Sequence, residues 1–517
     1  MTGRQKSDDR VVPEGRRKAH RAGASQQGKA VTVSKQVEQL ELFDETAVNP
    51  QGAAAARTSG PPGGKRSSVP KSSKGPGTAL PPMVMEEVAS DANLRLAFRR
   101  VARNRGAPGP DRQSIGEVRE NLDEVMTELG RSLLDGSYRA GDVRRVWIPK
   151  ASGGRRGLGI PNVVDRIVQQ AVHQVLAPHY EKTFHRWSFG FRPGRGGHAA
   201  IKQAMLHLGA GYDWVVDIDL EKFFDQVNHD RLMSRLEQRI RDRRILSLVR
   251  QMLRARIVLP EGVVVRNEQG TPQGGPLSPL LSNIVLDELD AELERRGHRF
   301  VRYADDCNVY VRSERAGRRV MASLESFIRK RLQLKVNADK SKVAKPQECT
   351  FLGLTLHRLK SGKVRVLVAD RSWQRLQQQL KALSPRNWGH SLDECIRRAN
   401  LFLRGWLGYF AICDVKHHPR MGRIDGHLRR RLRALLLKQW KRKRHIINRL
   451  IALGVPAPMA RVDIYAGSRS WWALSDRRAV HRGLTTGYFE WRGLFGLHAH
   501  WRQLHDRTWD IGPACPG

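Results

Sequence analysis

Apolar residues recur at helical spacing over residues 85–103 and again over 114–134, which predicts two helices near the start of the folded chain. The pattern then changes to alternation. Residues 143–149 predict a strand, and residues 155–161 predict its return partner across a glycine-containing turn. A longer apolar stretch over 163–176 predicts a buried helix. This part of the chain is therefore predicted to mix helices with strands.

Two later apolar runs end in carboxylates. The run that begins at Trp214 carries Asp217 and Asp219, and a second run ends in the adjacent pair Asp305 and Asp306. Neighbouring aspartates repel each other and are costly to bury, so this pattern favours a bound cation. Asp219 is the predicted third ligand. Asp217 lies on the same strand face but further from the strand end, and is the less favoured ligand.

Two glycine-rich loops are candidates for contact with phosphates or nucleotides. Residues 188–195 contain Arg192 and Arg195, and such a loop lets cations and backbone amides approach phosphates closely. A tight turn with solvated arginines is the alternative. Residues 270–276 contain two adjacent glycines beside Gln273, whose side chain can hydrogen-bond a base or a sugar edge.

The chain is predicted to be helical from about Ser372, with an apolar cluster over 401–410. Leucines and a tryptophan between 428 and 440 recur at helical spacing and predict an amphipathic helix. Its opposite face and its end are strongly basic, which favours contact with RNA over simple solvation. The basic residues of this prediction are Arg429, Arg430, Arg433, Lys441, Arg442, Lys443 and Arg444.

The amino-acid composition indicates what kind of partner the protein binds. Residues 1–80 are rich in small, proline and basic residues and offer too little apolar surface to offset ordering entropy, so a disordered basic arm is expected. The whole chain has 92 Lys+Arg against 51 Asp+Glu, a formal charge of +41. So positive a surface attracts polyanions, and nucleic acid is the leading partner.

The five cysteines show neither C-x-x-C spacing nor an even framework, which argues against a zinc finger and a disulfide scaffold. A reducing compartment is therefore expected. No apolar run reaches the roughly 18 residues that a membrane span needs. These features predict a cytoplasmic protein without a membrane partner.

The chemistry-bearing segments form an ordered series. ARNRGAPGPD, IPKASGGRRGLGIPNVVDR and SFGFRPGRGGHAA come first, and the Asp219 motif, GTPQGGPLSPLLSNI, YADD and FLG follow. In this order they resemble the reverse transcriptases encoded by bacterial group II introns, the RT–maturases, over roughly residues 85–510. An isolated YADD would be weak evidence, whereas the whole series makes chance an unsatisfactory explanation.

The resemblance implies an α+β right-hand polymerase, with fingers and a palm built on an antiparallel sheet, followed by an α-helical thumb or maturase domain. The implied divisions are an arm at 1–80, an N-terminal extension and fingers at 81–205, and a palm at 206–370. The thumb or maturase domain, domain X, would follow at 371–455. A basic aromatic nucleic-acid-binding tail would close the chain at 456–517.

The resemblance also implies residue roles. Asp219, Asp305 and Asp306 match the carboxylates that hold two Mg²⁺ ions, as two-metal phosphoryl transfer requires. Lys340 matches a lysine near the leaving pyrophosphate, a general-acid candidate whose alternative is an ordinary solvated lysine.

The remaining matched residues would contact the dNTP substrate. Lys150 and Arg156 match finger residues on the triphosphate, and Gln273 matches a glutamine beside the nucleotide. Phe224 matches the ring under the incoming sugar, where a 2′-hydroxyl would clash. Plain core packing is the alternative for Phe224.

The activity implied is RNA-directed DNA synthesis, joined to binding of group II intron RNA, assistance in its splicing and support of intron mobility. The implied partners are intron RNA in a ribonucleoprotein, an RNA template with a DNA or RNA primer, and a DNA target. Binding to that target would place the protein at the nucleoid. Many relatives carry a zinc-dependent H-N-H endonuclease with paired cysteines, and its absence is expected here because Cys515 stands alone.

Two other functions stay open on the sequence. One is an RNA-binding splicing cofactor with a vestigial polymerase site, although all three metal carboxylates and Gln273 are present. The other is a domesticated relative that serves defence or repair. A primer-extension assay separates the first alternative from the polymerase, and a folded intron RNA in the neighbouring DNA bears on the second.

The charge distribution predicts that affinity for structured RNA depends steeply on salt. If six or more phosphates are contacted, affinity should fall by about 10³-fold or more between roughly 50 and 200 mM salt, because each contact releases counterions. Fluorescence anisotropy with a labelled structured RNA measures this. An affinity that stayed flat over that range would contradict the prediction.

Overall fold

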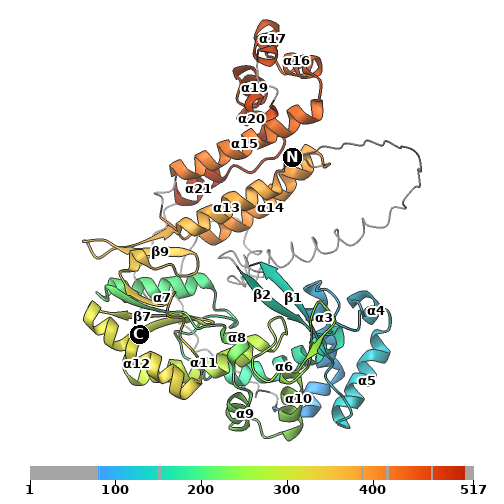
Figure 1. Cartoon of the computed structure of the whole chain (residues 1–517), viewed down its shortest axis with the longest axis vertical. Coiled ribbons are helices and arrows are strands. Elements are labelled where there is room, and N and C mark those ends of the chain that lie inside the picture. The colour runs from blue at the N-terminus through green and yellow to red at the C-terminus, as the bar shows by residue number, and fades with distance from the viewer. Residues whose placement is uncertain are drawn as a thin grey trace, which may run out of the picture.

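The computed structural model describes residues 80, 82–149, 154–385, 389–414, 418–466 and 470–506. The expected basic arm, apart from Leu80, lies outside these residues, as do Lys150 and Cys515. The protein is α+β, as the sequence predicts: two sheets carry the first two thirds, and helices make up the last third (Figure 1).

The two helices predicted at the start are each broken into two. Ser90 interrupts the first helix, because its side chain accepts a hydrogen bond from the Asn93 amide and so caps a new helix. Asn121 interrupts the second helix with a non-helical ψ of 33°. The elements are α2 (Met85–Ala89), α3 (Asp91–Arg103), α4 (Ile115–Glu120) and α5 (Leu122–Leu134), followed by the predicted buried helix α6 (Val163–Glu181).

The predicted hairpin is confirmed and belongs to a four-stranded sheet, which we call the fingers sheet. Strands β1 (Val143–Pro149) and β2 (Arg155–Ile160) pair antiparallel, with Trp147 opposite Gly157. The sheet order is β2-β1-β4-β5, in which β4 (Ile257–Val258) runs parallel to β1. The edge strand is β5 (Val264–Val265).

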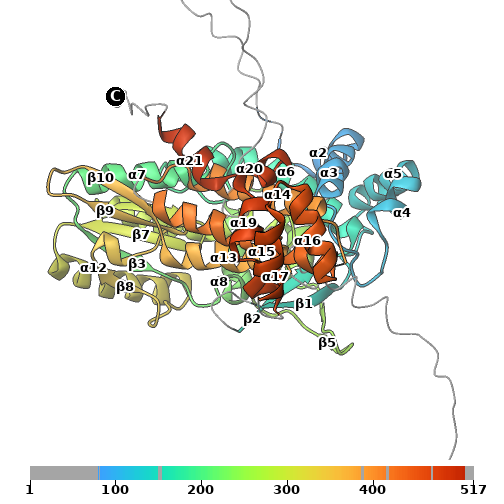
Figure 2. The same ribbon diagram turned by 90° about the horizontal axis from the view of Figure 1, so that it is seen from above.

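The second four-stranded sheet, which we call the palm sheet, is wholly antiparallel, with the order β6-β7-β3-β8. It lies between helices α7 and α12, as Figures 1 and 2 both show. Its strands are β3 (Trp214–Ile218), β6 (Arg299–Tyr303), β7 (Asp306–Val311) and β8 (Lys342–Ala344). The helices of this region are α7 (Gly197–Gly209), α8 (Phe223–Gln226), α9 (His229–Glu237), α10 (Arg243–Leu253), α11 (Ser278–Arg295) and α12 (Glu314–Phe327).

Short helical turns and a separate hairpin lead from the palm to the thumb helices. The turns are η2 (Ile328–Leu332) and η3 (Pro346–Glu348), and the hairpin pairs β9 (Leu354–Arg358) with β10 (Val364–Val368). The helices then rise above the two sheets in Figure 1. They are α13 (Asp370–Leu383), α14 (Leu392–Phe410), α15 (His418–Trp440), α16 (Lys443–Ala452), α17 (Ala457–Tyr465), α18 (Trp471–Leu474), α19 (Arg478–Gly483), α20 (Thr486–Trp491) and α21 (Leu497–Asp506).

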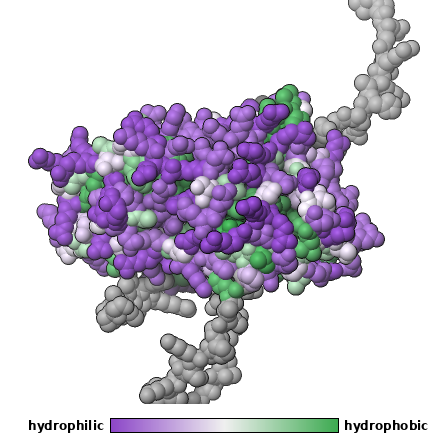
Figure 3. Space-filling view, turned by 90° about the horizontal axis from the view of Figure 1, so that it is seen from below, coloured by the Kyte–Doolittle hydropathy of each residue, from purple (hydrophilic) through white to green (hydrophobic). Residues whose placement is uncertain are grey.

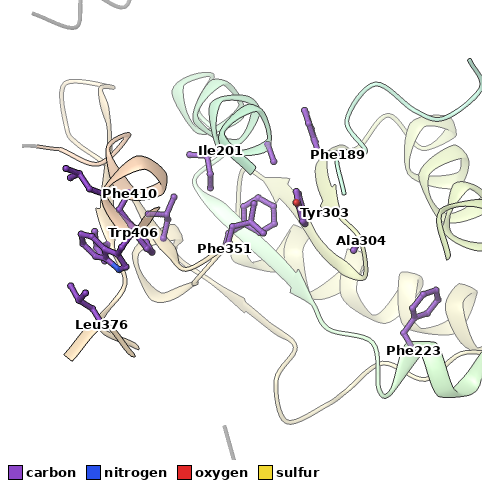
Figure 4. Packing of buried hydrophobic residues seen from close by; sticks show 14 of the residues in the cluster. Phe189, Ile201, Phe223, Tyr303, Ala304, Phe351, Leu376, Trp406 and Phe410 are labelled. Atoms are coloured by element: carbon purple, nitrogen blue, oxygen red, sulfur yellow. The ribbon is translucent and has the colours of Figure 1, made fainter. Parts of the chain in front are cut away.

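The thumb helices are fixed to the palm through the segment 351–353. Phe351 is buried between Ile201 of α7 and the aromatic cluster of α14 that contains Trp406 and Phe410 (Figure 4). The Tyr409 hydroxyl donates to the Leu352 carbonyl at 2.8 Å. One apolar core therefore runs from the palm into the thumb, and this limits how freely the thumb can move.

The predicted amphipathic helix is present as α15, and its leucine stripe is buried. The helix ends at Trp440, because Lys441 adopts a left-handed conformation with φ of 61°. The basic run 441–444 therefore forms the connection to α16 and its first turn instead of extending the helix. The face of the protein seen in Figure 3 is largely hydrophilic, with small scattered apolar areas.

Four cysteines are buried and unpaired, namely Cys307, Cys349, Cys395 and Cys413. Among the helices of the described residues, none is both long enough and apolar enough to cross a bilayer.

Candidate active site

A cleft of about 640 Å³ opens between the fingers and palm sheets. Six of the residues predicted for the site line it: Asp219, Asp305, Lys340, Arg156, Phe224 and Gln273. Its remaining lining includes Arg145, Trp147, Asn267 and Gln269, which the sequence did not single out. The cleft thus brings together predicted residues that lie up to 184 positions apart in the chain, from Arg156 to Lys340.

Two of the three carboxylates that line the cleft, Asp219 and Asp305, meet because of strand register, whereas the third is Asp225. In the palm sheet Ile218 pairs with Cys307, so the next residue of that strand, Asp219, lies level with Asp306 beside the β6–β7 turn. Asp305 occupies that turn, between the paired residues Tyr303 and Asp306. Asp306 is the first residue of β7 and is absent from the described cleft lining, as is Asp217. Their roles as metal ligands stay predictions.

The electrostatics around Asp219 and Asp305 favour a bound cation. Burial raises the pKa of Asp305, and the nearby Asp219 carboxylate raises it further, whereas Arg156 and Lys340 act in the opposite direction. Burial also raises the pKa of Asp217 to about 6. Two carboxylates held together with part of their hydration removed are stabilised by a positive charge between them.

The donor set fits Mg²⁺. Proteins bind this ion through one or two carboxylates and leave the other positions to water and substrate phosphates. Within the described residues, no group of three or more His, Cys, Asp or Glu side chains is arranged to hold a metal by itself. Asp219 and Asp305 would therefore need phosphate oxygens to complete a metal's coordination.

Lys340 lies beside Asp219 in the cleft, and its predicted place near a leaving pyrophosphate stays a prediction. Its Nζ atom is 3.3 Å from Oδ2 of Asp219, and its side chain is 59 % exposed. The segment that carries it is held in place, because the Asp219 amide donates to Oγ of Ser341 and the Asn337 amide donates to the Asp219 carbonyl. The ammonium group can therefore reach both the carboxylates and solvent.

Arg156 and Gln273 join the fingers to the palm on the other side of the cleft. Nε of Arg156 donates to Oε1 of Gln273 at 2.6 Å. The Gly159 amide of the same strand donates to the Gln273 carbonyl at 2.7 Å. Gln273 is buried. These contacts fix the side-chain direction of both residues and leave the guanidinium of Arg156 other donors for an anion.

Phe224 lies half-buried in the cleft lining, and the neighbouring Phe223 is part of the core. The two rings contact edge to face, with their centroids 5.2 Å apart. The Phe224 carbonyl accepts from the Thr271 amide at 2.7 Å, and Gly270 has a φ of 89° and no room for a Cβ atom against this carbonyl. The ring is thus supported from the core and from the glycine-rich loop.

Two sequence families match this chain. Residues 148–356 match the reverse transcriptase (RNA-dependent DNA polymerase) family, and residues 373–451 match the group II intron maturase-specific domain. The first range contains every described residue of the predicted catalytic set, and the second covers α14 and α15 with most of α13 and α16.

Protein YkfC of Escherichia coli is 32% identical over 317 residues, which cover 53% of this chain and 83% of YkfC. The chain belongs to the group II intron reverse transcriptase family. The group II intron-encoded protein LtrA of Lactococcus lactis is 38% identical over 169 residues, 32% of this chain and 28% of LtrA. The chain therefore matches only about a quarter of that relative's length.

Among solved structures, a chain of the partial Cas6-RT-Cas1–Cas2 complex is similar over 48% of this chain and 42% of its own length. The identity is 24% and the TM-score is 0.32, and a likeness this weak carries no argument about function.

The β6–β7 turn that carries Asp305 is held by a fully buried arginine whose role sequence reasoning missed. Arg302 forms a buried two-bond ion pair with Asp290 of α11, with Nε to Oδ1 at 2.7 Å and Nη2 to Oδ2 at 2.5 Å. Its other donors bond Oδ1 of Asn283, the Ala304 carbonyl and Oγ of Ser188. All five N–H groups of the guanidinium are thus used, and one of them fixes the residue before Asp305.

The structure contradicts the predicted nucleic-acid role of Arg192. The side chain is 2 % exposed, and it bonds the Glu181 carboxylate and the carbonyls of His185 and Ser188. Its donors are therefore committed inside the protein. Arg195 is half-buried, donates to the Arg186 carbonyl, and stays a prediction as a nucleic-acid contact.

The glycine- and arginine-rich loop 188–195 instead supports the catalytic turn. A Cβ atom on Gly190 would overlap the backbone of Ala304, so only glycine permits this approach. The Gly190 carbonyl accepts from Nδ2 of Asn283 at 2.8 Å. The motif is therefore explained by packing beneath Asp305.

Arg433 of the thumb is a second correction. It is buried, its Nε donates to the Leu484 carbonyl at 2.9 Å, and burial lowers its pKa to about 10. It holds α15 to the following helices. Arg430 is partly committed, since it packs over the Trp472 ring and pairs with Asp476. For Arg429, Lys441, Arg442, Lys443 and Arg444 the predicted contact with RNA stays a prediction.

One signal could have found Arg302. It stands inside an otherwise apolar run, residues 300–304, where an unpaired charge would be costly. Asp290 did not stand out in the same way, because Asp287, Glu288, Glu292 and Glu294 lie near it on the same helix. The arginines and the tryptophan of the cleft lining carried no comparable signal.

Removing the charge of Arg302 should destabilise the protein strongly. Arg302→Met leaves Asp290 buried without a partner, and the expected loss in free energy of unfolding is about 3–5 kcal/mol. Urea unfolding measures it. The exposed helical pair of Glu314 and Arg318 supplies the matched control, because Arg318→Met should cost at most about 0.5 kcal/mol.

The double variant Arg302→Met with Asp290→Leu should lose less stability than the sum of the two single variants, because neither charge is then left unpaired. Equal, small losses for Arg302→Met and Arg318→Met would contradict the role given to this pair.

Proposed function

We propose that this protein is an RNA-directed DNA polymerase that uses Mg²⁺ and dNTPs and copies an RNA template from a DNA or RNA primer. We further propose that it binds group II intron RNA as a ribonucleoprotein, assists splicing and supports mobility into a DNA target. Its place would be the cytoplasm, and the nucleoid when it is bound to DNA. The family membership supports the general class.

One observation carries the polymerase proposal. The cleft joins two carboxylates with Lys340 on one side and with the Arg156–Gln273 pair and the Phe224 ring on the other. A dNTP offers a triphosphate, a sugar and a base. The described lining supplies Arg156 for the triphosphate, the Phe224 ring for the sugar and the Gln273 amide group near the base.

Asp219 and Asp305 would hold the metal against the primer end and the triphosphate. Bound Mg²⁺ supplies a lower pKa for the primer 3′-hydroxyl and compensates charge on the phosphates. Arg156 would bind the β- and γ-phosphate oxygens, oriented by its bond to Gln273. Lys340 would stand beside the leaving pyrophosphate as a proton donor.

The thumb supports the RNA-binding part. Residues 373–451 match the maturase-specific domain, and Lys441, Arg442 and Arg444 are exposed at the end of α15. Since α16 begins at Lys443, Lys441 and Arg442 form the connection between the two helices, and Arg444 lies in the first turn of α16. Base pairing with the template, instead of side chains, would select each nucleotide.

Replacing Asp305 with asparagine should abolish primer extension without unfolding the protein. The substitution keeps the side-chain shape and removes the charge, so extension should fall by more than about 100-fold, equivalent to the several kcal/mol that metal charge stabilisation supplies. Extension of a labelled primer on an RNA template with Mg²⁺ measures this. The exposed Asp230, far from the cleft lining, supplies the control Asp230→Asn.

If the wild-type protein does not extend the primer, the polymerase proposal fails. Retained binding of intron RNA with enhanced splicing would then favour an RNA-binding cofactor with a vestigial site. If Asp305→Asn extends as well as wild type, the assignment of this carboxylate is wrong.

The ring of Phe224 should exclude ribonucleotides. Phe224→Val shortens the side chain under the sugar, so the efficiency of rNTP relative to dNTP incorporation should rise by about tenfold or more, since a relieved clash of this kind amounts to roughly 1–3 kcal/mol. Single-nucleotide incorporation assays give the ratio. Phe327→Val, at a half-buried ring outside the cleft lining, should lower stability but leave the sugar preference unchanged.

A further inference from the structure

A second hollow, of about 660 Å³, lies on the palm away from the catalytic cleft. It is formed at the start of β6 and the end of β7, whereas Asp305 lies at the opposite ends of these strands. Its lining comes from the end of α11, from α12 and from the loop before β3. The lining residues are Tyr212, Arg295, Arg296, Gly297, His298, Arg299, Tyr310, Val311, Arg312, Ala316, Arg319, Val320 and Ser323.

The hollow, which we call the palm-end hollow, is lined by five arginines and by no acidic residue. Arg295 and Arg296 both pair with Glu292 outside the lining. Arg299, Arg312 and Arg319 form no ion pair with any described acidic residue, although ion pairs are common elsewhere on this surface. Three guanidiniums without neutralising acids thus converge on one cavity.

Aromatic groups hold two of these cations in place of carboxylates. The guanidinium carbon of Arg299 is 5.3 Å from the centre of the Trp187 ring, and that of Arg312 is 5.1 Å from the Tyr212 ring. Contact with both arginines lowers the pKa of the Tyr212 phenol. Each of these arginines also hydrogen-bonds the Tyr212 hydroxyl. A ring fixes a guanidinium without neutralising its charge, so the remaining donors are positioned and stay available.

The arrangement selects an anion of a particular kind. Converging guanidiniums repel one another, and an anion among them removes that repulsion. The planar guanidinium fork matches pairs of phosphate oxygens, which is why arginine predominates in phosphate recognition. Successive phosphodiesters of a nucleic acid backbone present such oxygens at regular intervals along one edge.

We propose that the palm-end hollow binds the phosphodiester backbone of a folded RNA that is distinct from the primer and template in the cleft. This inference rests on the RNA binding proposed above and adds a second place for it. The strand from Arg299 to Tyr303 alone spans about 13 Å, so the hollow and the catalytic turn face separate ends of the palm sheet. Both can then be occupied at once.

The test uses the full chain with its cleft already filled by a chain-terminated primer on an RNA template. A labelled RNA hairpin is then titrated at several salt concentrations and followed by anisotropy. The triple variant Arg299→Gln, Arg312→Gln and Arg319→Gln should bind the hairpin at least tenfold more weakly. The slope of log affinity against log salt should become shallower by about two to three, close to one per lost phosphate contact.

A second triple variant controls for net charge. Arg241→Gln, Arg243→Gln and Arg254→Gln remove the same charge from exposed positions on and beside α10. This variant should bind the second hairpin nearly as wild type does. Both triple variants should extend a primer at the wild-type rate, because none of the six arginines lines the catalytic cleft.

The outcomes separate this inference from the proposed function. If wild type binds the second hairpin and both triple variants weaken it equally, the hollow is not a site and only overall charge matters. Wild-type primer extension without any binding of a second hairpin would overturn the hollow and leave the polymerase standing. A DNA hairpin that binds better than RNA, or full competition by inorganic tripolyphosphate at low concentration, would contradict a folded RNA as occupant.

Discussion

The buried ion pair of Arg302 and Asp290 is the interaction on which the catalytic end of the palm depends. Both side chains are fully buried, and a charge in that setting is tolerated only when its partner and its hydrogen bonds are complete. Arg302 satisfies this by bonding α11, the loop at Ser188 and the turn at Ala304 simultaneously. Helix α11, the turn at Ala304 and the sequence-distant loop at Ser188 are therefore fixed together beneath Asp305.

This rigidity matters because the cleft carboxylates are individually unfavourable. Burial and mutual repulsion raise the pKa of Asp305, so the folded protein carries an electrostatic strain that a cation relieves. A turn free to move would separate the two carboxylates and lose that affinity. The close approach of Gly190 to Ala304 and the full use of the Arg302 donors prevent such movement.

Sequence reasoning succeeded where the deciding information was local. Alternation predicted the β1–β2 hairpin, and the position of Asp219 after an apolar strand predicted its place beside the turn. It failed where contacts with distant segments of the chain determine whether a side chain is buried or exposed. Arg192 and Arg433 resemble solvated cations in the sequence, but Glu181 and the carbonyls of other segments enclose them. The helix break at Ser90 is local, because Ser90 caps the next helix through the Asn93 amide, but the apolar pattern did not capture it.

Whether an arginine is bonded within the fold also changes what the net charge of +41 implies about nucleic-acid binding. Part of that charge is structural, because arginines such as Arg192 and Arg302 donate their hydrogen bonds to carboxylates and carbonyls within the fold. Arginines held by rings, such as Arg299 and Arg312, keep their donors for a ligand. The number of cations on a surface therefore says little about where nucleic acid binds. The more informative feature is a cation that the fold positions and leaves without an acid.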